Sequence, residues 1–296
     1  MKVVITGNKG MLGRDLVERL WNAGFDLIGV DIGELDITRL DNVLDCLKSF
    51  DPDLVINCAA YTAVDKAESE PELAFAVNSD GPAHLAHACA RLKSPLIHIS
   101  TDYVFDGNAK KPYCEDDPVN PLGVYGQSKW KGEEAVRLRL KEHLIVRTSW
   151  LYGVHGYNFV KTMLRLAREK DEVKVVNDQH GCPTWTGDLS NTLVKLVNRI
   201  SHDRSGIPWG TYHFCGRGST TWYSFAKAII EESKKKEHLS VTQISPIATE
   251  DYPTPVKRPK WSVLDCRKVE STFQIRPKEW RKGLLAMLKK LSTAID

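Results

Sequence analysis

Residues 2–13 read KVVITGNKGMLG, and this stretch decides the fold. Residues 2–6 are apolar and mostly β-branched, which is typical of a strand, and apolar side chains recur at helical spacing after Gly13. The three glycines therefore lie between a strand and a helix, where parallel α/β sheets bind the phosphates of a dinucleotide. Because the spacing is Gly-x-x-Gly-x-x-Gly, a glycine-rich surface turn is the alternative interpretation.

Each glycine would have its own function in a phosphate-binding turn. Gly7 would form the tight turn, Gly10 would let the pyrophosphate approach the backbone, and Gly13 would let the helix pack closely on the strand. The start of the helix would offer its free amides, in particular those of Met11 and Leu12, to the phosphates.

Strand and helix patterns alternate through the first half of the chain. Strands are expected over 2–6, 26–30, 54–60, 95–100 and 143–148, with helices over 71–92 and through a segment that ends near residue 141. This alternation predicts an α/β fold, a Rossmann-type doubly wound parallel sheet with a smaller C-terminal α/β substrate lobe. We expect the dinucleotide-binding domain over 1–151 plus about 184–214, and the lobe over about 152–183 plus 215–296.

In the second half, helices are expected over 157–169, 188–200 and from 220 to 232, with a strand over 211–214. The proline-rich stretch 246–259 is expected to be a loop, and a loop of that length in a compact lobe is usually functional.

Several residues at predicted strand ends are candidates for the adenosine side of the cofactor. Asp31 could accept hydrogen bonds from the ribose, which favours NAD over NADP. The pair Asp36-Ile37 could approach the adenine, or Asp36 could cap the helix that follows, and the sequence leaves both open. Small residues fit a close backbone approach, and the candidates after the 54–60 strand begin with two of them: Ala59, Ala60 and Tyr61.

Tyr125 and Lys129 are four residues apart and would share one face of a helix. An ammonium group near a phenol favours the phenolate, so Lys129 is expected to lower the pKa of Tyr125 toward neutrality. Tyr125 would then exchange a proton with a carbonyl or an alcohol. A bare Tyr-x-x-x-Lys also occurs on ordinary amphipathic helices, so its significance depends on the glycine-rich turn upstream.

The composition excludes some classes of protein. The chain has 41 Lys and Arg against 38 Asp and Glu, and a net charge of +3 is too small to indicate a nucleic acid partner. Seven scattered cysteines without a Cys-x-x-Cys favour reduced thiols over disulfides or a zinc site. The chain begins directly with a strand pattern rather than a signal peptide, and no apolar run approaches the ~18 to 20 residues of a membrane span. We therefore expect a cytoplasmic protein without a membrane partner.

Together these features resemble the extended short-chain dehydrogenase/reductase superfamily. Several runs make the chain similar, over essentially its whole length, to the family of dTDP-4-dehydrorhamnose reductases: NCAAYTAVDKAE at 57–68, STDYVFDG at 100–107, RTSW at 147–150, NDQHGCPT at 177–184, YPTP at 252–255 and Arg258-Pro259. The run Thr101-Asp102-Tyr103 disfavours a dehydratase, because sugar-nucleotide dehydratases typically carry Glu where Tyr103 stands.

This resemblance implies a reaction and its residues. Thr101 would join Tyr125 and Lys129 as a catalytic group in the NADPH- or NADH-dependent reduction of the C4 carbonyl of dTDP-4-dehydro-β-L-rhamnose. Asp102 and Trp150 would contact the sugar, although Trp150 could equally be core packing. Arg258 would bind the pyrophosphate of the substrate or form a surface ion pair.

The resemblance also has departures and alternatives. Tyr61 stands where well-known members have His. Some members resemble metal-dependent dimers with Glu at the interface, and the shorter Asp15 and Asp188 at those positions predict no obligatory magnesium, with a homodimer left possible. Another sugar-nucleotide reductase or epimerase, or a regulatory dinucleotide-binding subunit, would be the other function classes.

Overall fold

A computed structural model describes residues 1–293 and contains a six-stranded parallel sheet. Its strand order is β10-β5-β4-β3-β1-β2. The strands are β1 (Lys2–Thr6), β2 (Asp26–Val30), β3 (Leu54–Asn57), β4 (Leu96–Thr101), β5 (His143–Thr148) and β10 (Gly210–His213). The predicted Rossmann-type sheet is therefore confirmed. The order reverses direction between β1 and β3, and ligands of such sheets bind beyond the carboxyl ends of the strands at this point.

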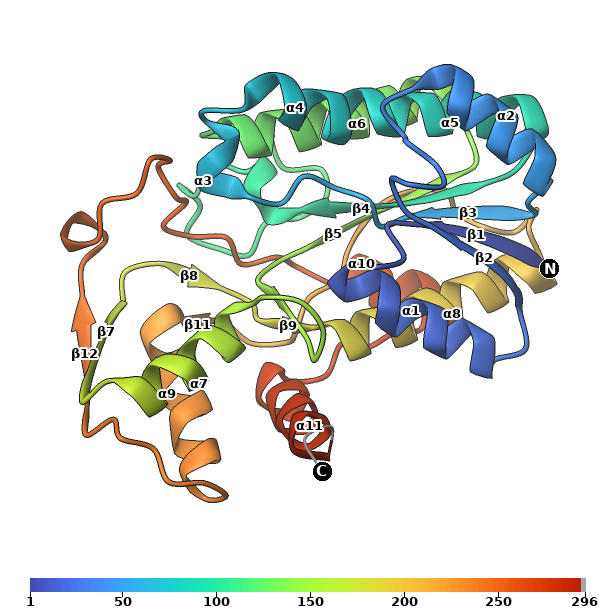
Figure 1. The fold of residues 1–296 in the computed structure, drawn as a ribbon. Coiled ribbons are helices and arrows are strands. Elements are labelled where there is room, and N and C mark those ends of the chain that lie inside the picture. Colours follow the sequence, from blue (N-terminus) through green and yellow to red (C-terminus); the bar gives the residue numbers. More distant parts are fainter. Residues whose placement is uncertain (294–296) are drawn as a thin grey trace.

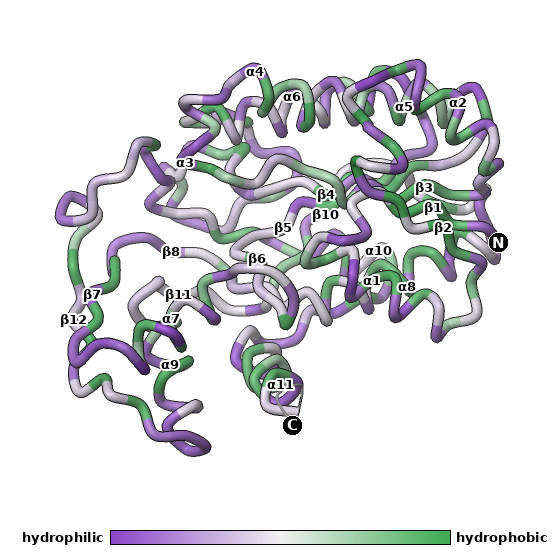
Figure 2. Tube along the Cα trace, viewed as in Figure 1, coloured by the Kyte–Doolittle hydropathy of each residue, from purple (hydrophilic) through white to green (hydrophobic). Residues whose placement is uncertain are grey.

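Helices cover both faces of the sheet (Figure 1). One face carries α2 (Leu40–Phe50), α4 (Pro71–Phe75), α5 (Gly81–Leu92) and α6 (Val124–Arg139), with the short α3 (Val64–Ala67) near its end. The other face carries α1 (Met11–Asn22), α8 (Thr186–His202) and α10 (Arg267–Phe273). Each face has its own apolar core, and Figure 2 shows the hydrophobic residues concentrated along β1, β2 and β3 between these layers.

Most predicted helices and strands lie within two residues of the observed ones, and two differ more. The helix expected over 71–92 consists of α4, a π-helical turn (Ala76–Asp80) and α5. The strand expected over 54–60 ends at Asn57, because the next amide, that of Cys58, donates to the Thr6 carbonyl (3.1 Å) and the Asn57 side chain accepts from the amide of Ala59 (3.1 Å). The chain therefore turns toward the glycine loop directly after β3.

A further apolar cluster lies in the C-terminal half, among α7 (Phe159–Glu169), α9 (Trp222–Lys234) and α11 (Trp280–Thr293). Three two-stranded sheets accompany it. They are β7 (Glu172–Val176) with β12 (Gln243–Ile247), β8 (His180–Gly181) with β11 (Thr220–Thr221), and β6 (Leu151–Tyr152) with β9 (Thr184–Trp185). The first two residues of the loop expected over 246–259 belong to β12. Among residues 1–293, no helix has the length and apolar character needed to cross a membrane.

Candidate active site

The glycine loop has the geometry of a phosphate-binding turn. Gly7 has a φ of +67°, and a Cβ there would lie 2.6 Å from the backbone nitrogen of Ala59, so only glycine fits. A Cβ on Gly13 would collide with the Gly7 carbonyl oxygen. Gly10 is the N-cap of α1 and provides no side-chain cap, so the first amides of the helix, including those of Met11 and Leu12, are free for an anion. These residues fit a dinucleotide pyrophosphate.

Asp31 lies at the end of β2 beside this loop. Its carboxylate accepts from the amides of Lys9 (3.1 Å) and Ile32 (2.9 Å), and the Lys9 ammonium pairs with Glu34 (3.2 Å). The structure therefore brings the candidate ribose ligand next to the candidate phosphate loop, with a lysine beside it.

Asp36 and Ile37 lie in the turn that precedes α2. The Asp36 carboxylate accepts from the amide (3.0 Å) and hydroxyl (2.7 Å) of Thr38, so it holds the turn before α2 and is not the N-cap of that helix. The Ile37 side chain is buried against Gly81, and its carbonyl oxygen contacts His84 Nδ1 (2.9 Å). The Ile37 side chain therefore belongs to the apolar core, and the approach of this pair to an adenine stays a prediction.

The backbone of Ala59, Ala60 and Tyr61 passes the glycine loop and is anchored to the π-helical turn. Asn78, which is fully buried in that turn, exchanges hydrogen bonds with the amide and carbonyl of Tyr61 (2.9 Å each). Its amide group also donates to the Ser128 hydroxyl (3.1 Å), one residue before Lys129. The candidate adenosine side and the candidate catalytic helix are therefore connected through one buried asparagine.

Tyr125 and Thr101 meet at the carboxyl end of β4. Tyr125 is buried, and burial raises its pKa to about 12, while a hydrogen bond with Thr101 opposes that rise. The Lys129 ammonium donates to the Ile99 carbonyl oxygen (2.7 Å), and burial lowers the pKa of Lys129 to about 8. The expectation that Lys129 lowers the pKa of Tyr125 is wrong for this structure, because burial of the phenol dominates and the ammonium is directed to the backbone of β4.

Asp102 is a buried carboxyl group next to these residues. Only 1 % of it is exposed, and burial raises its pKa to about 7. Its Oδ1 accepts from the Thr101 hydroxyl (3.1 Å), whereas its buried Oδ2 has no hydrogen bond of good geometry among residues 1–293, although the nearby Ser262 hydroxyl lowers the pKa. An unsatisfied buried acceptor beside a catalytic hydroxyl suits a ligand hydroxyl. Ser262 carried no signal in the sequence.

The indole ring of Trp150 is held in place by Trp222 and Gly181. It has a φ of +47°, which is rare for a bulky residue, and its ring stacks on Trp222 with centroids 3.5 Å apart and planes 6° apart. A Cβ on Gly181 would collide with the indole, so Gly181 lies against the ring. Trp222 therefore covers one face of the indole, and Gly181 lies against its Nε1 side. Trp222, which the sequence did not indicate, holds this arrangement.

Arg258 forms an ion pair with Asp65 (2.8 Å). It also lies close enough to Tyr103 to oppose the rise of the Tyr103 pKa that burial causes, so the 246–259 loop reaches the start of α6. In this structure Arg258 forms an ion pair, as one of its two interpretations expects. It also lies beside the candidate site, so binding of the substrate pyrophosphate stays a prediction.

Asp15 and Asp188 do not form a metal site with each other. Asp15 is buried and accepts from the Thr186 hydroxyl, and Asp188 pairs with Lys278 (2.9 Å). Within the part of the chain that the structure describes, no group of three or more His, Cys, Asp or Glu side chains could hold a metal ion. The expectation of no obligatory metal stays a prediction.

The parallel sheet, the glycine loop and the Thr101, Tyr125 and Lys129 side chains define an NAD(P)H-dependent oxidoreductase of the short-chain dehydrogenase/reductase type. Comparison with known proteins identifies its family. The family described as RmlD substrate binding domain matches residues 1–293, and the chain belongs to this family.

The similarity to individual relatives covers nearly the whole length of both chains. The chain is 43 % identical to a dTDP-4-dehydrorhamnose reductase of Aggregatibacter actinomycetemcomitans over 96 % of this chain and 97 % of that protein. It is similar to the crystal structure of a dTDP-4-dehydrorhamnose reductase from Clostridium acetobutylicum (TM-score 0.92, 41 % identity, covering 99 % and 100 % of the two chains). It is also similar to the Bacillus anthracis dTDP-4-dehydrorhamnose reductase in complex with NADP (TM-score 0.90, 37 % identity, covering 98 % and 99 %).

Proposed function

We propose that this protein reduces the C4 carbonyl of dTDP-4-dehydro-β-L-rhamnose to dTDP-L-rhamnose with NADPH or NADH. The single observation that carries the proposal is that the buried Tyr125 lies near Thr101 at the end of β4, with Lys129 one helical turn away on α6. Relatives that bear the name of this reductase support the choice of substrate.

The bound nicotinamide cofactor supplies a hydride, and the chain supplies position, protons and electrostatics. Tyr125 donates its hydroxyl proton to the oxygen that becomes the alcohol. A pKa of about 12 keeps Tyr125 protonated at neutral pH, which suits a proton donor rather than a base. The Thr101 hydroxyl hydrogen-bonds the same oxygen and stabilises the negative charge that develops on it.

Lys129 has two functions in this scheme. Below a pH of about 8 it is an ammonium ion, which can bind the hydroxyls of the nicotinamide ribose. Its positive charge also stabilises the phenolate that Tyr125 becomes after it has given up its proton. Both functions require the ammonium to leave the Ile99 carbonyl or to share its three protons with it.

We assign the substrate to residues beside this centre. The unpaired Oδ2 of Asp102 accepts a sugar hydroxyl, the edge of Trp150 borders the ring, and Arg258 moves from Asp65 to the pyrophosphate. We further propose that the cluster around α7, α9 and α11 forms the sugar-nucleotide lobe, with the division of the chain over about 152–183 plus 215–296.

We also propose a cytoplasmic enzyme, which is supported by seven free cysteines among the described residues. Light scattering after size-exclusion chromatography tests the possible homodimer, once with and once without a chelator.

The experiment measures the loss of nicotinamide absorbance with NADH and NADPH separately, in the presence of dTDP-4-dehydro-L-rhamnose generated in situ. Oxidation of cofactor matched by formation of dTDP-L-rhamnose is expected, and the faster cofactor gives the preference. Cofactor binding without oxidation would reject the proposal. In that case, other 4-keto sugar nucleotides test another reductase of the superfamily, and capture of an unrelated synthetase tests a regulatory subunit.

A further inference from the structure

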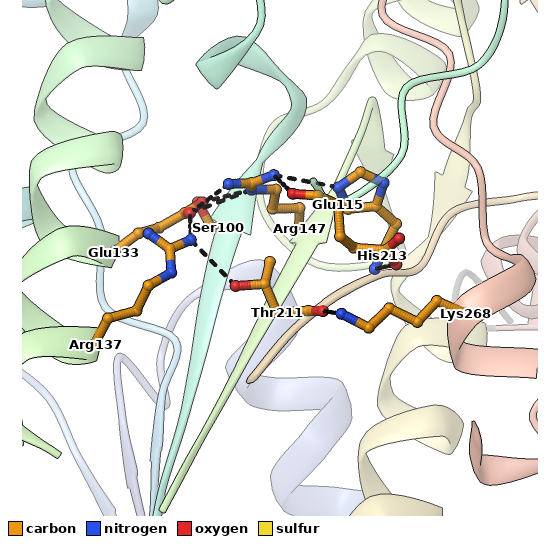
Figure 3. Close-up of polar contacts among 8 residues, drawn as sticks. All are labelled: Ser100, Glu115, Glu133, Arg137, Arg147, Thr211, His213 and Lys268. Carbon is orange, nitrogen blue, oxygen red and sulfur yellow. Dashed lines mark hydrogen bonds and ion pairs between the residues drawn. The ribbon is translucent and has the colours of Figure 1, made fainter. Parts of the chain in front are cut away.

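A buried ion-pair network is centred on Glu133 and Arg147 (Figure 3). Glu133 is 0 % exposed and Arg147 only 1 %. Arg147 Nε donates to both carboxylate oxygens of Glu133 (2.9 and 3.2 Å), and Nη2 donates to Oε2 (2.7 Å). The Ser100 hydroxyl donates to Oε1 (2.5 Å) and Arg137 to Oε2 (2.5 Å). Four hydrogen-bonding groups therefore converge on one carboxylate.

Two members of the network adjoin residues of the candidate active site. Glu133 lies one helical turn after Lys129 on α6, and Ser100 directly precedes Thr101 on β4. The Ser100–Glu133 hydrogen bond therefore joins α6 to β4 within one residue of the place where Tyr125 meets Thr101.

The network continues to the edge of the sheet (Figure 3). Arg147 Nη1 donates to the Glu115 carbonyl oxygen (3.3 Å), and the Glu115 carboxylate accepts from the amide of His213 on β10 (2.8 Å). Arg137 donates to the Thr211 hydroxyl (3.1 Å). The position of α6 is thus fixed by β4, β5 and β10 together.

A buried ion pair is weak evidence for stability, because an apolar pair of similar volume often stabilises a fold as well or better. Its better-attested use is to specify one arrangement of the elements it joins. Here the elements joined are those that hold Tyr125, Lys129 and Thr101.

We propose that Glu133, held by Arg147 and Ser100, is a positioning residue of the reduction. It fixes α6 against β4 so that Tyr125 lies beside Thr101, and it stands one helical turn from the buried Lys129 on the same helix. This inference rests on the proposed function.

The groups that face Lys129 favour this assignment. Glu133 on α6 raises the pKa of Lys129 against the effect of burial, and Cys58 after β3 acts in the same direction to a smaller extent. His98 on β4 also faces Lys129, but burial lowers its pKa well below the ordinary value, so it is neutral. Arg137 and Arg147 both pair with the Glu133 carboxylate, and Arg137 also contributes to the low pKa of His98. Glu133 is therefore the one anion among the described residues that acts on this ammonium.

The test compares wild type with Glu133→Gln. Removing the negative charge lowers the pKa of Lys129, so the alkaline limb of the kcat profile is expected to move to lower pH. Loss of the fixed geometry is expected to reduce kcat by roughly a hundredfold, with a much smaller change in KM for the sugar nucleotide. Glu237→Gln is the control, because it breaks the exposed Arg168–Glu237 pair (2.9 Å) and is expected to change neither quantity.

A second measurement does not depend on turnover. The pKa of Lys129 is followed from its ¹³Cε shift by NMR, assigned by Lys129→Met, in wild type, Glu133→Gln and the double variant Glu133→Gln/Arg147→Gln. In the single variant the Arg147 guanidinium is buried without its carboxylate partner, which can prevent folding. The double variant removes that guanidinium as well, so the Lys129 pKa can still be measured if the single variant does not fold. A lower Lys129 pKa is expected in Glu133→Gln, and a smaller decrease is expected in the double variant, because it also loses the positive charge of Arg147. An unchanged Lys129 pKa in the variants would overturn the inference. An alkaline limb that does not move in Glu133→Gln, while wild type is active, would also overturn it. If wild type itself is inactive on the sugar nucleotide, only the proposed function is rejected.

Discussion

Replacing Lys129 with Met is expected to make the protein more stable while removing its turnover. Lys129 is 2 % exposed, and burial lowers its pKa from 10.5 to about 8. Between these two pH values the unfolded chain holds a proton that the folded chain lacks, so stability rises with pH across this window. Below pH 8 the buried ammonium costs about 3 kcal/mol relative to an unperturbed lysine.

The substitution removes this cost but also a hydrogen bond to the Ile99 carbonyl, which is worth about 1 kcal/mol net. Lys129→Met should therefore gain about 2 kcal/mol at pH 7, the gain should vanish at pH ~10, and above pH 10.5 the variant should be about 1 kcal/mol less stable than wild type. The assay is urea unfolding across this pH range. Lys131→Met is the control, because Lys131 is exposed on the same helix and pairs with Glu134 at the surface. A Lys129→Met protein less stable than wild type at pH 7 would refute the reasoning.

Three further predictions concern the same site. Tyr125→Phe should lower kcat by a factor of about 10² to 10⁴, because the proton donor is lost. Cofactor binding, followed by quenching of the protein fluorescence, should stay near normal. Undiminished turnover in this variant would reject the assignment of Tyr125. Gly13→Ala should weaken cofactor binding strongly in titrations, because its Cβ would collide with the Gly7 carbonyl, whereas Gly33→Ala, which has open space, should not. Folding raises the pKa of the Asp102 carboxyl from 3.8 to about 7. Between these two pH values the folded chain holds a proton that the unfolded chain lacks, so the free energy of unfolding of wild type should fall as the pH rises from 4 to 7. Asp102→Asn should abolish that fall in urea titrations.

Much of the sheet could be predicted because its signals are local. The strands β1, β2 and β5 have the boundaries that their apolar β-branched runs indicate. Gly7 and Gly13 have the predicted roles, since a positive φ and a backbone contact leave room for no other residue.

The remaining differences come from contacts distant in sequence. The two-residue strands β6, β8, β9 and β11 exist only through pairing with remote segments and have too few residues to show a period. The high pKa of Tyr125 follows from its burial. The ring of Tyr103 contributes to that burial, with its centroid 5.6 Å from that of Tyr125. The helical spacing of Tyr125 and Lys129 does not reveal these surroundings. The Glu133–Arg147 pair joins α6 to β5 across the core and likewise has no local signal.

The central claim is that this chain directs a hydride to C4 of the dehydrorhamnosyl group. It is tested most directly with NADPH deuterated on the transferable C4 position of the nicotinamide, dTDP-4-dehydro-L-rhamnose and NMR of the product. The account predicts dTDP-L-rhamnose with one deuterium at C4 of the sugar. A product without deuterium, with deuterium at another carbon, or no product from protein that binds the cofactor would contradict it.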